Sequence, residues 1–161
     1  MLGERIKRIL ALFLAALTLS ACMAGCRNVE PTEIRGIAHF FFTESGGSDF
    51  DARTAYQLDY ADGYYTAVIK PAGVKEKKAR TVIVDAEFVD RLEAVLTEYD
   101  VKSWNGFDEK DYDIMDGIGF TLDVVMADES EIDAVGYMEW PEGFGYVSSA
   151  FDELFLGAYK K

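Results

Sequence analysis

Apolar and polar residues alternate along several stretches of this chain, a pattern typical of β-strands. In the clearest stretch, residues 37–42, apolar groups occupy both sides of the expected strand. One side carries Ile37, His39 and Phe41, and the other carries Ala38, Phe40 and Phe42. Because both sides would then be buried, we expect a central strand of a sheet here.

Further strands are expected over residues 54–60, 65–69, 120–126 and 132–137, with a short one over 81–84. Ala61, Asp62 and Gly63 predict a tight hairpin between the first two of these, because glycine accepts a positive φ. Residues 86–99 have helical periodicity and follow Asp85, a good N-cap. Residues 144–156 predict a last helix, which Gly157 would end.

The order of these elements is β-β-β-(β)-α-β-β-α. It predicts an α+β domain with two layers, in which an antiparallel sheet of five or six strands is packed by two helices. A chain of 161 residues is too short for more than one ordinary domain besides its leader. The other face of the sheet would be partly exposed to solvent, and aromatic residues of the first strand would line a groove there.

The first 21 residues have the pattern of an export signal. Arg5, Lys7 and Arg8 form a basic start, and the apolar residues 9–19 would make a helix of only about 16 Å. Leu19-Ser20-Ala21-Cys22 follows, which resembles the lipobox of bacterial lipoproteins. The resemblance implies that a lipid is attached to the thiol of Cys22 and that the leader is cleaved before this residue.

Two alternatives stay open at this junction. One is an ordinary secretory signal cleaved after Ala21. The other is lipidation of Cys26 in Met23-Ala24-Gly25-Cys26, which lies four residues farther from the apolar stretch. With Cys22 as the attachment site, we expect a signal peptide over residues 1–21, a tether over 22–33 and one globular domain over 34–161. This domain would be exported and anchored by palmitate on the outer face of the cell membrane.

The composition narrows the classes of function. Half of the residues are hydrophobic, which excludes a disordered acidic tail. The net charge is −13, which argues against nucleic acid as a partner. Loss of residues 1–21 removes three basic groups and one acidic group, so the mature charge is −15. We expect such a domain to be repelled by anionic headgroups and to face outward.

No catalytic constellation is evident, so we predict a non-enzymatic protein without catalytic residues or a cofactor. The only histidine, His39, is interpreted as a buried, hydrogen-bonded core residue. Both cysteines lie at the leader junction, which excludes a zinc site of Cys and His from the domain. Glu139 and Glu142 flank Trp140-Pro141, and this pattern leaves a small carboxylate-based hydrolase as an alternative.

An acidic stretch supplies the only candidate metal ligands, which are Asp108, Asp111, Asp113 and Asp116. Calcium binds six to eight oxygen atoms, often from carboxylates spaced as Asp111 and Asp113 are. The stretch is not an EF-hand, because Asp116 comes one position late and the bidentate glutamate is absent. A solvated acidic loop is the main interpretation, and an irregular calcium site is the alternative.

Trp104-x-Gly106-Phe107, Asp116-Gly117, Phe120-x-Leu122 and Gly136-Tyr137-Met138-x-Trp140-Pro141-x-x-Phe144 form a second pattern. Over roughly the last 60 residues, this pattern resembles uncharacterised lipid-anchored or secreted domains of Gram-positive anaerobes. The resemblance carries no reaction and no ligand. Trp104 and Trp140 are therefore read as core residues first, and as candidate ligand contacts second.

The leading functional hypothesis is a non-enzymatic surface lipoprotein whose domain binds an extracytoplasmic protein, a wall polymer or a saccharide. Its many Tyr and Trp residues suit such contacts. A structural or inhibitory subunit of a membrane-associated complex is the second hypothesis, and it predicts an exposed apolar patch. The small hydrolase is the third.

Overall fold

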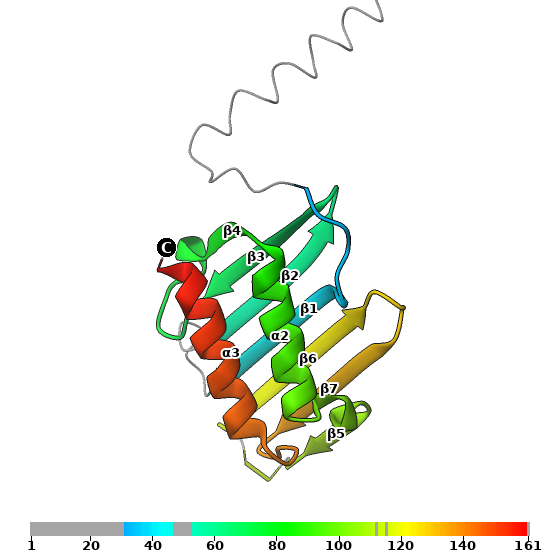
Figure 1. The fold of residues 1–161 in the computed structure, drawn as a ribbon. Helices are drawn as coiled ribbons and strands as arrows, with labels where there is room; N and C mark the ends of the chain where they lie inside the picture. Colours follow the sequence, from blue (N-terminus) through cyan, green and yellow to red (C-terminus); the bar gives the residue numbers. More distant parts are fainter. Residues whose placement is uncertain (1–30, 47–52, 112, 115, 161) are drawn as a thin grey trace, which may run out of the picture.

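The computed structural model describes residues 31–46, 53–111, 113–114 and 116–160. The strands are β1 (Ile37–Gly46), β2 (Thr54–Ala61), β3 (Tyr64–Lys70), β4 (Arg80–Val84), β5 (Phe107–Lys110), β6 (Ile118–Met126) and β7 (Glu131–Tyr137). The helices are α2 (Ala86–Glu98) and α3 (Phe144–Tyr159), and Glu76–Lys78 and Val101–Trp104 form single 3-10 turns, η2 and η3. Both α-helices lie across the same face of the sheet, so the domain is α+β with two layers (Figure 1).

The seven strands form one sheet in the order β4-β3-β2-β1-β6-β7-β5. β1 lies in the middle, as its sequence predicts. Every neighbouring pair is antiparallel except β5 and β7, which are parallel. The sheet is therefore mixed and larger than the expected antiparallel sheet of five or six strands.

The additional strand, β5, occupies Phe107–Lys110, part of which the sequence assigns to an acidic loop. Three of its four residues are charged, so the stretch carries no apolar alternation. Its parallel pairing requires the chain to cross from α2 to the far edge of the sheet, and η3 makes that crossing. Such a long-range connection leaves no local sequence signal.

Most predicted elements are confirmed within a residue or two. Asp62 and Gly63 both have positive φ, at 53° and 84°, as a tight type I′ hairpin requires. The side chain of Asp85 caps α2 by accepting a hydrogen bond from the Phe88 amide at 3.0 Å. Gly157 does not end the last helix, which continues to Tyr159.

A bulge in β1 changes which residues of this strand share a face. The pairing with β6 shifts between Ile37 and His39, because Ile37 lies opposite Met126 whereas His39 lies opposite Val125. Ile37 is consequently in the core with Phe40. The expectation that Ile37 shares a face with His39 and Phe41 is wrong for this reason.

Aromatic side chains join the sheet to α3. The ring of Phe151 lies 5.0 Å from that of Phe40 and 5.1 Å from that of Phe42, edge to face in both cases. The ring of Phe155 stacks on Tyr56 at 4.7 Å with only 2° between the planes. All five side chains are almost completely buried, so they account for much of the apolar area removed from water.

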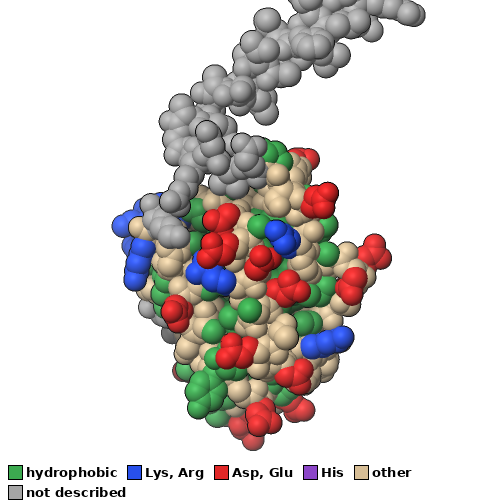
Figure 2. All heavy atoms as spheres, viewed as in Figure 1, with side chains coloured by type: hydrophobic (Ala, Val, Ile, Leu, Met, Phe, Trp, Pro, Cys, Tyr) green, Lys and Arg blue, Asp and Glu red, His purple; other side chains and the backbone are tan. Residues whose placement is uncertain are grey.

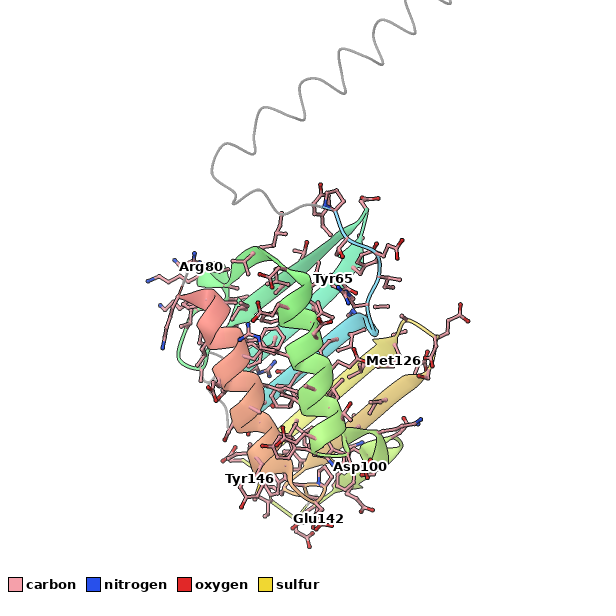
Figure 3. The ribbon with its side chains drawn as sticks, viewed as in Figure 1. Tyr65, Arg80, Asp100, Met126, Glu142 and Tyr146 are labelled. Atoms are coloured by element: carbon pink, nitrogen blue, oxygen red, sulfur yellow. The ribbon has the colours of Figure 1, made fainter. Side chains whose placement is uncertain are left out.

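The segment that precedes β1 is attached to the β2–β3 hairpin. The amide of Thr32 donates to the carbonyl of Gly63 at 2.9 Å, and the hydroxyl of Tyr60 donates to the carbonyl of Thr32 at 2.8 Å. The hydroxyl of Tyr65 accepts from the Arg35 amide at 2.5 Å and donates to the Ile37 carbonyl at 3.0 Å. Ordered contacts thus begin at Thr32 among the described residues, and Figure 3 labels Tyr65 at this end of the sheet.

Among the described residues, no helix has the length and apolar character needed to cross a membrane.

The pKa shifts of two buried tyrosines predict how the free energy of unfolding changes at alkaline pH. Burial raises the pKa of Tyr56 well above its ordinary value of 10.0, and its hydrogen bond to Asp152 adds to the shift. Burial also raises the pKa of Tyr65. Because both hydroxyls keep their protons in the folded state while the unfolded chain loses them, stability falls as the pH rises above about 10.

Tyr56→Phe tests this prediction. We expect it to lower the free energy of unfolding at neutral pH by about 1–2 kcal/mol, because the 2.7 Å bond from the Tyr56 hydroxyl to Asp152 is lost. The decline in stability above about pH 10 becomes shallower, since one titrating group is gone. Urea unfolding across this pH range measures both effects, and Tyr146→Phe is the control because Tyr146 is 73% exposed. An unchanged alkaline decline in the Tyr56 variant would contradict the assignment.

Candidate functional site

No described helix covers the second face of the sheet, which we call the open face. Side chains alternate between the two faces of each strand, so the residues of β1 that follow the bulge and do not face α3 are His39, Phe41, Thr43 and Ser45. All four are half-buried. The sequence predicts such a partly solvated face, and the structure places aromatic and polar groups together on it.

Phe41 lies at the centre of the open face. Its cross-strand neighbours are Gln57 on β2 and Asp123 on β6, and the next row contains His39 opposite Asp59. An aromatic ring is therefore flanked by an amide and a carboxylate, with a second carboxylate and an imidazole in the next row. The sequence shows Gln57 and Asp59 only as the polar side of a strand, because the register that brings them beside Phe41 is a long-range property.

His39 is part of a hydrogen-bonded chain on this face. Its Nδ1 lies 2.7 Å from Oδ1 of Asp59, and Nε2 of Gln57 donates to Oδ2 of Asp59 at 2.6 Å. An ionised carboxylate only accepts, so Nδ1 of the imidazole carries the proton in this contact. The side chain of His39 is 31% exposed. The interpretation of His39 as a buried core residue is wrong, although its hydrogen bonding is confirmed.

A pocket of about 560 Å³ lies at the Gly46 end of β1. Its walls include Thr43, Ser45, Thr121, Tyr137, Lys110 and Ile114, from four strands and the loop after β5. Its lining thus contains four hydroxyl groups, one amine and three apolar side chains, since Phe120 and Val135 also belong to it. The pocket adjoins the row of Phe41, because Thr43 and Thr121 are the next open-face residues along β1 and β6.

Tyr137 fixes the loop that borders this pocket. Its hydroxyl accepts from the Gly117 amide at 2.7 Å and donates to the Ile114 carbonyl at 2.8 Å. Its carbonyl accepts from the amide of Asp111 at 2.9 Å. The hydroxyl and the carbonyl of Tyr137 thus hold the acidic loop against the end of the sheet.

Glycines allow the close packing behind the pocket. A Cβ atom on Gly136 would lie 2.3 Å from the carbonyl oxygen of Glu139 and 2.4 Å from the ring of Phe120. A Cβ on Gly119 would lie 2.9 Å from the carbonyl oxygen of Gly136. Because two of these contacts are with backbone atoms, a side chain could be accommodated only by moving the strands.

The four candidate calcium ligands do not converge in the described part of the chain. Asp108 forms an ion pair with Lys110 at 2.5 Å, and Asp111 accepts a hydrogen bond from the Asp113 amide at 3.0 Å. Asp113 and Asp116 are exposed. Within the described ranges, no three His, Cys, Asp or Glu side chains are grouped so that they could hold a metal ion.

The two candidate tryptophans have different environments. Trp104 is only 3% exposed, its ring packs near Phe120 and Phe144, and its Nε1 donates to the Glu142 carbonyl at 3.2 Å. Trp140 is 38% exposed and rests on Phe144 with ring centroids 6.3 Å apart. Of the two, Trp140 offers surface to a ligand.

Glu139 and Glu142, the acids of the hydrolase hypothesis, are both exposed. Among the described residues, the only buried polar or charged side chains are Thr54 and Lys70, so none of the described carboxylates is buried. Cys22, Cys26 and the lipobox residues lie outside the described residues.

No family model and no curated protein matches this chain.

Gly136→Ala tests the packing behind the pocket. We expect a loss of about 1–3 kcal/mol in the free energy of unfolding, because the new methyl group overlaps Phe120 and the Glu139 carbonyl. Gly157→Ala is the matched control, since a Cβ there meets nothing within 4 Å and lies inside α3. This second variant should gain up to about 1 kcal/mol from helix propensity. Equal effects in the two variants, measured by urea unfolding, would contradict the packing described here.

Proposed function

We propose that this protein is a surface lipoprotein, anchored through Cys22 to the outer face of the cell membrane, whose domain binds a cell-wall saccharide without catalysing a reaction. The observation that carries the binding proposal is the composition of the open face. There an aromatic ring, Phe41, is flanked by Gln57 and Asp123 and adjoins a pocket lined with hydroxyl groups.

The chemistry of a sugar suits this surface. A pyranose ring has apolar C–H faces and a rim of hydroxyl groups that both donate and accept hydrogen bonds. Phe41 presents an apolar platform, while Asp59, Asp123 and Gln57 supply acceptors and an amide donor. Orientation of a ligand by a few polar groups around an apolar surface is the usual arrangement of a small-molecule site.

The anchor proposal rests on the sequence alone. The basic start, the short apolar stretch and Leu19-Ser20-Ala21-Cys22 follow one another at lipoprotein spacing. The expected tether over residues 22–33 would span at most ~40 Å when extended. The open face would therefore act close to the membrane, at the inner side of the wall.

Binding is tested by titrating soluble wall-glycan fragments into the protein and following NMR shifts or calorimetric heat. Phe41→Leu keeps an apolar side chain but removes the ring, and it should weaken binding by roughly tenfold, the worth of an aromatic contact. Asp123→Ala should weaken binding to a similar degree. Glu98→Ala, an exposed acid on α2, is the control and should leave the affinity unchanged.

Two outcomes would contradict the saccharide proposal. One is the absence of any binding by a folded protein across the glycan panel, which would favour a protein ligand. The other is binding that is insensitive to Phe41→Leu and Asp123→Ala, which would place the ligand elsewhere.

The anchor is tested separately with single cysteine variants. Cys22→Ala should abolish incorporation of labelled palmitate and release the protein from the membrane fraction, because the acceptor thiol is gone. Cys26→Ala should retain both properties. The reverse pattern would assign the lipid to Cys26, and membrane release without lipid labelling in the wild type would indicate an ordinary secretory signal.

A further inference from the structure

The two edges of the sheet differ in how well they are protected against pairing with another strand. The β5 edge has four residues, of which Asp108, Glu109 and Lys110 are charged, and charge is a common protection of an edge. The β4 edge, Arg80–Val84, has one charged residue followed by Thr-Val-Ile-Val. Its pairing with β3 is continuous, without a bulge, and it contains no proline.

A groove of about 1010 Å³ lies between β4 and the two helices. Every residue of β4 lines it, and residues of both helices form its other walls. Phe88 of α2 and Leu154 of α3 belong to its walls. Among the described residues, β4 ends the sheet and no strand pairs with its outer side. Such an edge is a surface to which a further strand can add.

Charge is ordered along this edge. Just before β4 lie Lys75, Lys77 and Lys78, with Glu76 among them, and just after it lie Asp85 and Glu87; all of these side chains are exposed. The start of the strand thus carries a net positive charge and its end a net negative charge. Arg80 opens the strand, and its guanidinium contacts the Tyr159 carbonyl at the end of α3. Figure 2 shows Lys and Arg side chains gathered at the border of the molecule where Figure 3 labels Arg80, whereas acidic groups are spread over much of the visible face.

We propose that β4 pairs with β4 of a second copy of this chain, antiparallel and about a two-fold axis. In that arrangement the basic start of each strand lies beside the acidic end of the other, so the charge order is self-complementary. A parallel arrangement would instead bring like charges together. The rest of the domain is strongly acidic and repels a second copy, which makes this edge the place where two copies attract each other.

We place the two-fold axis at Val82, the middle residue of β4. Val82 lies opposite Val82 of the second copy, and Thr81 lies opposite Ile83. The two sheets then become one continuous sheet, with both helix layers on the same side. A pairing of only five residues buries less than the ~1,000 Å² of a stable interface, so the walls of the groove must contribute and we expect a dimer of moderate affinity.

Cysteine cross-linking of the full chain tests both the pairing and its register, with Cys22 and Cys26 replaced by serine. Residues directly opposite each other lie about 4.5–5.5 Å apart, which a disulfide can bridge. We therefore expect Val82→Cys to form a disulfide-linked dimer with copper phenanthroline as the oxidant. Thr81→Cys and Ile83→Cys should each fail alone, because equivalent residues are offset by about 7 Å along the strands. A mixture of these two variants should cross-link.

Charge variants provide a second test in the Val82→Cys background. Lys77→Glu and Glu87→Lys, each alone, should slow cross-linking by roughly tenfold, because like charges then meet across the axis. The double variant should restore the rate, since the charges are exchanged in both copies. Glu109→Cys, on the β5 edge, gives the rate of random collision.

Three results would overturn the proposal. Val82→Cys could cross-link no faster than Glu109→Cys, Thr81→Cys could cross-link with itself faster than Val82→Cys, or the double charge variant could remain slow. Circular dichroism confirms that each variant is folded. If Val82→Cys does not fold, the Thr81→Cys and Ile83→Cys mixture tests the same register. The proposal does not depend on the open-face ligand, because β4 lies on the edge of the sheet.

Discussion

Phe151 and Phe155 of α3 pack on Phe40, Phe42 and Tyr56, near the middle of the sheet. This contact joins the two layers, because Phe40 and Phe42 belong to the central strand and the remaining strands are added on either side of it. The site, the free edge and the attachment of the N-terminal segment all depend on it. With both helices drawn to one face, the other face of the sheet is left without a described helix over it.

Local signals predict most of the elements. Alternation predicts the position of β1 at the centre of the sheet. Asp85 marks the start of α2, and Asp62-Gly63 marks the turn between β2 and β3, because capping and turn preferences act within a few residues. β5 is not predictable in this way, because a short charged edge strand has no apolar period and gains its pairing from a distant segment. The sequence does not predict the bulge in β1 either, because the bulge changes the face on which Ile37 lies while the apolar pattern of residues 37–42 stays the same.

The candidate site is predicted less well than the fold. A partly wet face with aromatic residues of the first strand follows from the pattern of the sequence, but its chemistry depends on register. Nothing in the sequence distinguishes Asp59 and Asp123 from the other acidic residues. Strand pairing places Asp59 opposite His39 and Asp123 opposite Phe41. Conversely, Trp104 is conspicuous in the sequence and lies in the core. Residue type alone does not distinguish the two tryptophans, whereas their exposure does.

The segment that contains Thr32 and Arg35 is attached to the β2–β3 hairpin, and this attachment has a mechanical consequence. A pull on the chain from its N-terminal side reaches β1 along the strand axis, after loading the contacts with the β2–β3 hairpin. β1 is paired with β2 over His39–Glu44 on one side and with β6 over most of its length on the other. Tension is therefore applied to two ladders in shear, and many bonds must break together before the strand can leave. A domain held on this strand can bear a load applied from its N-terminal side without separation of β1 from its two neighbours.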